Sequence, residues 1–359
     1  MQALWFALIA VLWAGFFLLE GFDFGVGLLL PAVARTDADR KVALRSIGPF
    51  WDGNEVWLVV AGGATFAAFP EWYASVFSGF YLAFALLLVG LILRGIGIEY
   101  RGKAESARGR RWCDIAVVGG SGAAALLLGV AFADFLRGVQ MNAAHDVTGG
   151  FFDLLTPYAL LGGLTTLTLF ALHGACFLVL RTEGDVALRA QRLTRVLAPL
   201  AGLLALAFIA WTSQVRGGAV SLVLGAALVV ALLVAAGRGE HPARAFACTS
   251  TAAALVPVWV FAALYPDVLP ARNGAALSLT LSNASSSHYT LVVMTVVAAI
   301  FLPLVLAYTA WTYWVFRARV TGDSVVGDGY GGLAHVVSSA AESARGVLGG
   351  HSDEPPVRT

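Results

Sequence analysis

The chain has 359 residues, of which 59% are hydrophobic and only 13% charged, and its mean hydropathy is +0.80. A soluble domain usually carries about 25% charged residues, so this composition excludes a soluble globular fold. The formal net charge of +1 provides no basic field that would attract nucleic acid.

Apolar segments follow one another along the chain, each near the roughly 20 residues that a helix needs to cross a bilayer. Nine are expected, near residues 4–33, 49–69, 76–98, 115–135, 158–180, 197–215, 220–236, 245–265 and 289–316. The first lacks a basic start and is too long for a signal peptide, so we expect it to be retained. The sequence predicts an all-α integral membrane domain over residues 1–320, with about nine transmembrane helices.

A different composition marks the C-terminal end of the chain. Residues 321–359 are rich in Gly, Ser, Asp and Glu, which is typical of a mostly disordered segment. One weak helix is expected near 334–347.

Basic residues orient the predicted helices, because cytoplasmic loops are enriched in Lys and Arg. Of the 23 Lys and Arg residues, 20 fall after the first, third, fifth, seventh and ninth segments or at their ends. Only Arg137, Arg216 and Arg272 fall on the other side. This asymmetry predicts an outside N-terminus and a cytoplasmic C-terminus.

Charged residues inside predicted spans are costly and are functional candidates by default. The first span carries Glu20 and Asp23, the second opens with Asp52 and Glu55, and the third ends with Arg94 and Glu99. The predicted topology places all of them in the cytoplasmic half of the membrane. Asp52 and Glu55 share a helix face, and carboxylates so close cannot all carry charge cheaply. We expect a proton-conducting cluster in which Arg94 holds one carboxylate ionised.

Simpler interpretations stay open for individual residues. Asp52 could cap the second helix, because Asp is favoured at helix N-termini. Glu99 could be an interfacial charge that answers Arg101. His173 is the one histidine clearly within a span, and it is a weak candidate for a haem ligand. The three cysteines are far apart, without the spacing of a zinc site, so no metal site is predicted.

Several motifs together resemble subunit II of the cytochrome bd quinol oxidases. They are GFDFGVG, PFWDGNEVWL, AGGATFAAFPEWYASVFSGFY, RGIGIEYRGK, LHGACFLVLRT and SLTLSNASSSHYTLVVMT leading into YTAWTYW. These segments extend from about Glu20 to Trp314, nearly the whole predicted membrane domain. The combination of WDGNEVW with GFDFGVG is highly specific.

The resemblance implies a bacterial cytoplasmic membrane complex that oxidises quinol and reduces oxygen to water, building membrane potential without pumping protons. Subunit II of the family has two four-helix bundles plus one peripheral helix. It pairs with a subunit I that carries two b-type haems, haem d and the quinol site. A structural quinone in subunit II and small accessory subunits are further features that the resemblance leaves open.

The family also implies roles for particular residues. Asp52, with Trp51 beside it in the motif, matches an aspartate of the proton-uptake path from the cytoplasm. Glu99 takes a position that is Asp in some members, and Asp23 matches a carboxylate of less certain role. The short loop at 213–219, where some members carry long insertions, and the Gly-rich tail depart from the family pattern.

Two other classes of protein must be weighed against an oxidase subunit. A proton-coupled transporter could use the same buried carboxylates, although transporters tend to place broken helices at the midplane and these acids lie near one face. A purely structural scaffold for a partner protein is the third hypothesis. A haem-bearing partner would favour the oxidase.

Overall fold

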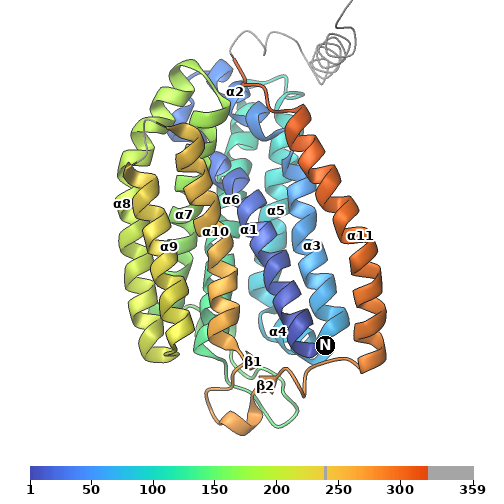
Figure 1. Ribbon diagram of the computed structural model, residues 1–359. Coiled ribbons are helices and arrows are strands. Elements are labelled where there is room, and N and C mark those ends of the chain that lie inside the picture. The colour runs from blue at the N-terminus through green and yellow to red at the C-terminus, as the bar shows by residue number, and fades with distance from the viewer. Residues whose placement is uncertain (238–240, 322–359) are drawn as a thin grey trace, which may run out of the picture.

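The computed structural model describes residues 1–237 and 241–321, so the predicted tail, with its weak helix near 334–347, lies almost entirely outside the described residues. Helices dominate the described chain (Figure 1). They are α1 (Gln2–Val33), α2 (Asp37–Ile47), α3 (Trp51–Ala68), α4 (Pro70–Gly79), α5 (Tyr81–Arg101), α6 (Ala107–Arg137), α7 (Pro157–Arg181), α8 (Gly184–Val215), α9 (Ala219–Gly237), α10 (Pro242–Leu264) and α11 (His288–Val315), with short 3-10 helices η1 (Phe151–Leu154) and η2 (Ala275–Leu277).

Seven helices in the described chain are long and apolar enough to cross a membrane: α1, α5, α6, α7, α8, α10 and α11. Two shorter helices, α3 with 18 residues and α9 with 19, run alongside them (Figure 1). Asp52 in the first turn of α3 and Glu55 one turn later lower its apolar character. The all-α architecture expected from the sequence is therefore observed, with seven of the nine expected spans long and apolar enough to cross a membrane in the described chain.

Two short helices were not expected. A capping box begins α2: Thr36 Oγ1 accepts a hydrogen bond from Asp39 N at 3.1 Å, and Asp39 Oδ2 accepts one from Thr36 N at 3.0 Å. The chain then breaks at Phe69, where Pro70 starts α4. The third span was expected to begin near residue 76, but it begins at Tyr81, because the preceding residues belong to α4.

Two other spans begin earlier than expected. Helix α6 starts at Ala107 rather than near 115, because Ser106 Oγ accepts a hydrogen bond from Gly109 N at 3.0 Å and caps it. Helix α8 starts at Gly184 rather than near 197. The polar first turns of both helices hid these starts from a search for apolar runs.

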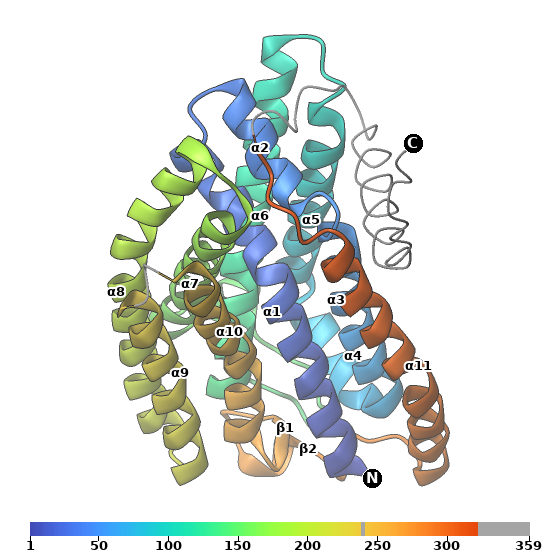
Figure 2. The ribbon, with the colours of Figure 1, turned by 45° about the horizontal axis from the view of Figure 1, so that its top comes forward.

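The helices pack in two groups around α1. In one, α7, α8, α9 and α10 contact one another in succession and α10 returns to α7; in the other, α1 contacts α3 and α6, and α6 contacts α5. Helix α1 also contacts α7 and α10, so it lies between the groups. Helix α11 stands at one side against α3 (Figures 1 and 2), and Leu291 is its one buried residue.

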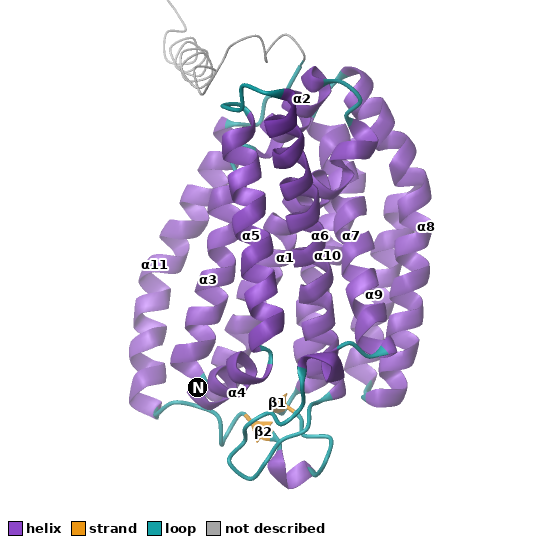
Figure 3. Ribbon diagram, turned by 180° about the vertical axis from the view of Figure 1, so that it is seen from behind, coloured by secondary structure: helices purple, strands orange, loops and turns teal. Residues whose placement is uncertain are grey.

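The two ends of the molecule differ in charge. Helix α2 and the connections from α5 to α6 and from α7 to α8 lie at one end, which we call the basic end (Figure 1). The N-terminus, α4 and the antiparallel strands β1 (Asp267–Leu269) and β2 (Leu279–Thr280) lie at the other (Figure 3). Two of the three arginines expected there are ion-paired, Arg137 with Asp134 at 3.5 Å and Arg216 with Asp267 at 2.6 Å.

Candidate functional site

The polar centre of the molecule forms where α1 crosses its neighbours. Helix α1 carries Glu20 and Asp23, which have no exposed surface. Gly25, half a turn beyond Asp23, lies against the backbone of Gly174 and the carbonyl of Phe170 on α7. This close crossing needs glycine, because a Cβ on Gly25 would overlap both. It holds the acidic part of α1 inside the helix bundle.

Arg94 is the cation of this centre. Its Nη1 donates a hydrogen bond to Glu20 Oε1 and lies 3.7 Å from Glu55 Oε2. The side chains of Arg94 and Glu20 are fully buried, whereas a quarter of the Glu55 side chain is exposed. Burial makes this pairing necessary, since an isolated charge in so apolar a setting costs several kcal/mol. One guanidinium thus joins α1, α3 and α5.

Aromatic rings flank Arg94. Its guanidinium carbon lies 4.8 Å from the ring centroid of Phe24 and 5.8 Å from that of Trp51. Such cation–π contacts are worth more when the cation is desolvated. Trp51, predicted as a motif neighbour, is therefore a direct neighbour of the predicted charge partner.

A second polar chain leads from Asp23 to the side helix α11. Asn54 Nδ2 donates to Asp23 Oδ2 at 2.7 Å and to the backbone carbonyl of Leu19 at 3.1 Å. Tyr313 on α11 donates its hydroxyl to Asn54 Oδ1 at 3.0 Å. Asp23 therefore faces α3 and α11, while Glu20 faces α5.

Asp52 lies at the edge of this cluster. It is the second residue of α3, exposed, one helical turn before Glu55. Phe50 is the N-cap residue of α3 and no side chain makes the capping hydrogen bond, so Asp52 does not cap the helix. Asp52 does lie in the first turn, where its negative charge suits the helix N-terminus, as that interpretation also held. Glu99 is half-buried on α5, five residues beyond Arg94 toward the basic end.

Several buried polar atoms of the cluster lack hydrogen-bond partners among the described residues. They are Glu20 Oε2, Asp23 Oδ1, and the Nε and Nη2 atoms of Arg94. An unsatisfied buried donor or acceptor costs about 1–3 kcal/mol.

His173 does not offer a haem ligand. It is fully buried, its Nδ1 lies 2.8 Å from Thr249 Oγ1, and its Nε2 lies 3.0 Å from the backbone carbonyl of Leu18. Both ring nitrogens are engaged in hydrogen bonds, so neither is free to ligate iron. Across residues 1–237 and 241–321, no group of three or more His, Cys, Asp or Glu residues is arranged to hold a metal ion.

Two partners in the site were missed by sequence reasoning. Asn54 stands inside the motif that drew attention to Asp52 and Glu55, but an amide carries no charge and was passed over. Tyr313 lies 259 residues from Asn54, and nothing local indicated their contact. Glu20 was noted as an intramembrane charge, but its role as the principal partner of Arg94 was not predicted.

Comparisons with known proteins agree on one family. Residues 1–316 match the family described as cytochrome bd terminal oxidase subunit II. The chain is 38% identical over 325 residues to cytochrome bd ubiquinol oxidase subunit 2 of Bacillus subtilis, covering 89% of this chain and 96% of that protein. It is 35% identical over 365 residues to cytochrome bd-I ubiquinol oxidase subunit 2 of Escherichia coli K12, covering 90% and 96%.

A solved structure supports the fold. The bd oxidase from Geobacillus thermodenitrificans contains a chain that matches with a TM-score of 0.65 and 17% identity, covering 98% of this chain and 99% of that one. At this identity the likeness concerns the fold alone. The sequence relatives, which the chain covers almost end to end, carry the assignment: this chain belongs to the cytochrome bd terminal oxidase subunit II family.

Proposed function

We propose that this chain is the subunit of a quinol:oxygen oxidoreductase that delivers protons from the cytoplasm to a haem-bearing subunit I. Membership of the family makes it a multi-pass protein of the bacterial cytoplasmic membrane and a bd-type oxidase subunit, and implies a subunit I partner. The observation that supports the proton-delivery role is the cluster of three carboxylates, Glu20, Asp23 and Glu55, on neighbouring helices around Arg94.

A face of α3 beside this cluster is the proposed binding surface for subunit I. On α3, Asp52, Val56 and Val59 lie on one helix face at helical spacing, and both valines are more than half exposed. On α5, Ile92 is 60% exposed. A carboxylate on an apolar, membrane-level face is unfavourable against lipid. We infer that subunit I covers this face and receives protons near Asp52.

The proposed path uses only titratable groups of this chain. A proton enters at the basic end near Glu99, passes among the carboxylates around Arg94, and leaves at Asp52 toward subunit I. Arg94 holds part of the negative charge in place, so that the cluster can bind a proton without losing its structure. The haems expected on subunit I, two of b type and one of d type, would carry the electrons from quinol to oxygen.

Protons taken from the cytoplasm would be consumed in forming water, and the protons released on the other side would come from quinol. Membrane potential would therefore build without any proton being pumped across. A structural quinone and small accessory subunits remain part of the family expectation.

The arrangement into nine spans, two groups of four helices plus α11, belongs to the same proposal. It counts α3 and α9 as spans because both run alongside the long apolar helices (Figure 1).

Replacing Asp52 by Asn tests the relay. Asn keeps the size but cannot titrate, so quinol-driven oxygen consumption of the purified complex should fall by about tenfold or more, with haem absorbance unchanged. Glu99→Gln should cause a smaller loss, because water can reach an interfacial position directly.

A matched control exists at the same end of the molecule. Asp185 is the second residue of α8, as Asp52 is of α3, and it is largely exposed. Asp185→Asn removes the same charge and should leave oxygen consumption unchanged. Full activity of the Asp52→Asn complex with intact haems would rule out Asp52 as a relay group.

Topology is tested by labelling single introduced cysteines in whole cells. Phe152, in the loop between α6 and α7, is 83% exposed. Phe152→Cys should react with a membrane-impermeant maleimide, whereas Glu105→Cys, between α5 and α6, should react only after permeabilisation. The parent chain controls for its own cysteines. The reverse pattern would overturn the predicted orientation.

A further inference from the structure

A cavity of about 750 Å³ opens at the basic end, between the end of α1 and helices α2, α5 and α6. It is separate from the acidic cluster around Arg94. Six of its lining residues carry charge: Arg40, Arg101, Arg110, Arg111, Asp37 and Asp114. Four guanidinium groups face two carboxylates, so the lining has an excess of two positive charges.

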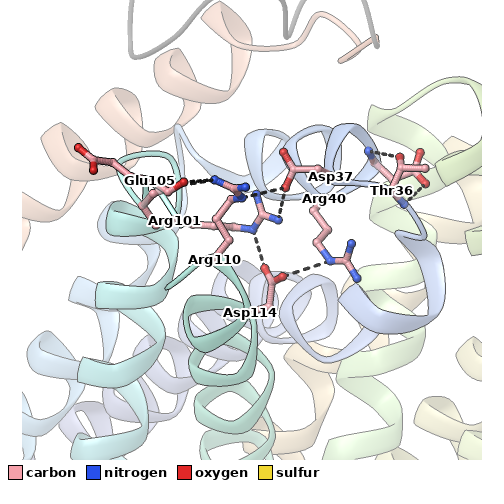
Figure 4. A network of polar contacts seen from close by, with 9 residues as sticks. Thr36, Asp37, Arg40, Arg101, Glu105, Arg110 and Asp114 are labelled. Atoms are coloured by element: carbon pink, nitrogen blue, oxygen red, sulfur yellow. Dashed lines mark hydrogen bonds and ion pairs between the residues drawn. The ribbon is translucent and has the colours of Figure 1, made fainter. Parts of the chain in front are cut away.

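The inner part of this charge network is internally satisfied (Figure 4). Arg101 is buried, and it donates hydrogen bonds to Asp37 Oδ1 at 2.8 Å and to Asp114 Oδ1 at 2.5 Å. Arg40 Nε lies 3.2 Å from Asp114 Oδ2. The hydrogen bond from Arg101 lowers the pKa of Asp37 below its usual value, so this carboxylate stays ionised at neutral pH. These contacts fix the walls of the cavity.

Two arginines at the mouth provide the excess charge. Arg110 donates through Nη1 to the backbone carbonyls of Ala104 at 2.9 Å and Glu105 at 3.1 Å, while its Nε is 3.9 Å from Asp37 (Figure 4). Arg111 is exposed and makes no ion pair or hydrogen bond with the described part of the chain. Arg110 is thus held in place mainly by uncharged backbone carbonyls, which leave its positive charge in place. The positive charge of Arg111 is available to bind an anion.

An apolar strip leads from the mouth along α6. Arg111, Ile115 and Gly119 follow at intervals of four residues, so they lie on one face of the helix, and all three line the cavity. Ile115 is 49% exposed, and a Cβ on Gly119 would meet no atom within 4 Å. Pro31 on α1 is exposed at the facing wall. The cavity is therefore positively charged at its mouth and apolar along α6, which suits a ligand with an anionic headgroup and an apolar tail.

We propose that this cavity binds an anionic phospholipid, with its phosphate at Arg110 and Arg111 and an acyl chain along Ile115 and Gly119. Guanidinium groups bind phosphate oxygens in bidentate geometry. Basic pockets between transmembrane helices at the cytoplasmic side suit acidic headgroups. A free phosphate shares the headgroup chemistry but would make no use of the apolar strip.

Lipid titration of the purified two-subunit complex tests this. After delipidation in detergent, binding of phosphatidylglycerol and of phosphatidylcholine with the same acyl chains is measured by native mass spectrometry. Phosphatidylglycerol should bind several-fold more tightly. Arg111→Gln should weaken its binding about fivefold, as expected for loss of one basic contact. Arg108→Gln is the matched control, because Arg108 is exposed on the same helix outside the cavity lining, and binding should stay within about twofold.

A second variant separates lipid from free anion. Gly119→Leu fills the open strip and should weaken phosphatidylglycerol binding, while millimolar inorganic phosphate should not displace the lipid from the parent complex. Thermal stability of this variant is checked in parallel, and Arg111→Gln decides the matter if it does not fold. The proposal fails if the two lipids bind equally, if Arg108→Gln and Arg111→Gln have equal effects, or if inorganic phosphate displaces the lipid.

Discussion

Replacing Arg94 by Met should destabilise the assembled complex by about 3–5 kcal/mol, the usual cost of removing one partner of a buried ion pair. Glu20 would then be fully buried with no cation, and Glu55 would lose the guanidinium 3.7 Å away. The measurement is the yield and thermal unfolding midpoint of the purified complex. Both should fall sharply.

The double variant Arg94→Met with Glu20→Met separates loss of the pair from loss of volume. Replacing both partners of a buried pair by apolar side chains is often neutral, so the double variant should regain most of the lost stability. It should not regain normal oxygen consumption, because the proposed path has lost two of its groups. Wild-type stability of the single variant would show that Arg94 and Glu20 are not paired in the membrane.

Gly25→Ala should also impair assembly strongly. The added methyl group would overlap the carbonyl of Phe170 and the backbone of Gly174, and neither can move without displacing α7. Overpacking of this kind costs about 1–3 kcal/mol, and more where backbone is struck. The hydrogen bond from His173 to the carbonyl of Leu18 crosses the same helix contact and would be strained with it.

Gly62→Ala is the control for Gly25→Ala. Gly62 lies within α3, and a Cβ there would meet no atom within 4 Å. Because Ala is the better helix former, this change should leave stability unchanged or slightly raised. Thermal unfolding of the two variant complexes, side by side, gives the comparison. Equal midpoints would mean that α1 and α7 do not cross as closely as described.

Much of the fold could be predicted because a bilayer imposes a simple rule on sequence. Each crossing helix needs a long apolar run, and such runs located the seven long apolar helices. Their ends were found to within about two turns, except for the start of α8, which lies more than three turns before the expected position. The segments that were not predicted are polar. The amphipathic α2 and the polar starts of α6 and α8 contain few apolar residues, so their helix starts are indicated by capping residues rather than by hydropathy. The capping box formed by Thr36 and Asp39 is the sequence feature that could have predicted the start of α2.

The site was only partly predictable. Charges inside spans stand out against an apolar background, so Asp23, Glu55 and Arg94 could be singled out and do come together with Glu20. Which carboxylate Arg94 binds depends on how α1 and α5 are rotated, and no local pattern gives that rotation. Asn54 and Tyr313 join the site through a contact between distant segments. Asp52 and Glu99 have positions that fit a path, and their roles stay predictions.

The Arg94–Glu20 pair also has a consequence for how the chain is made. The two residues are 74 positions apart, so in N-to-C synthesis α1 reaches the membrane before α5 does. A charged residue near the centre of a span raises its insertion free energy by about 2.5–3.5 kcal/mol, against about 0.3–0.6 kcal/mol gained by each Leu, Ile, Val or Phe. The many Leu and Phe residues of α1 therefore serve biogenesis as well as packing, since they must keep the helix in the bilayer until its cation arrives.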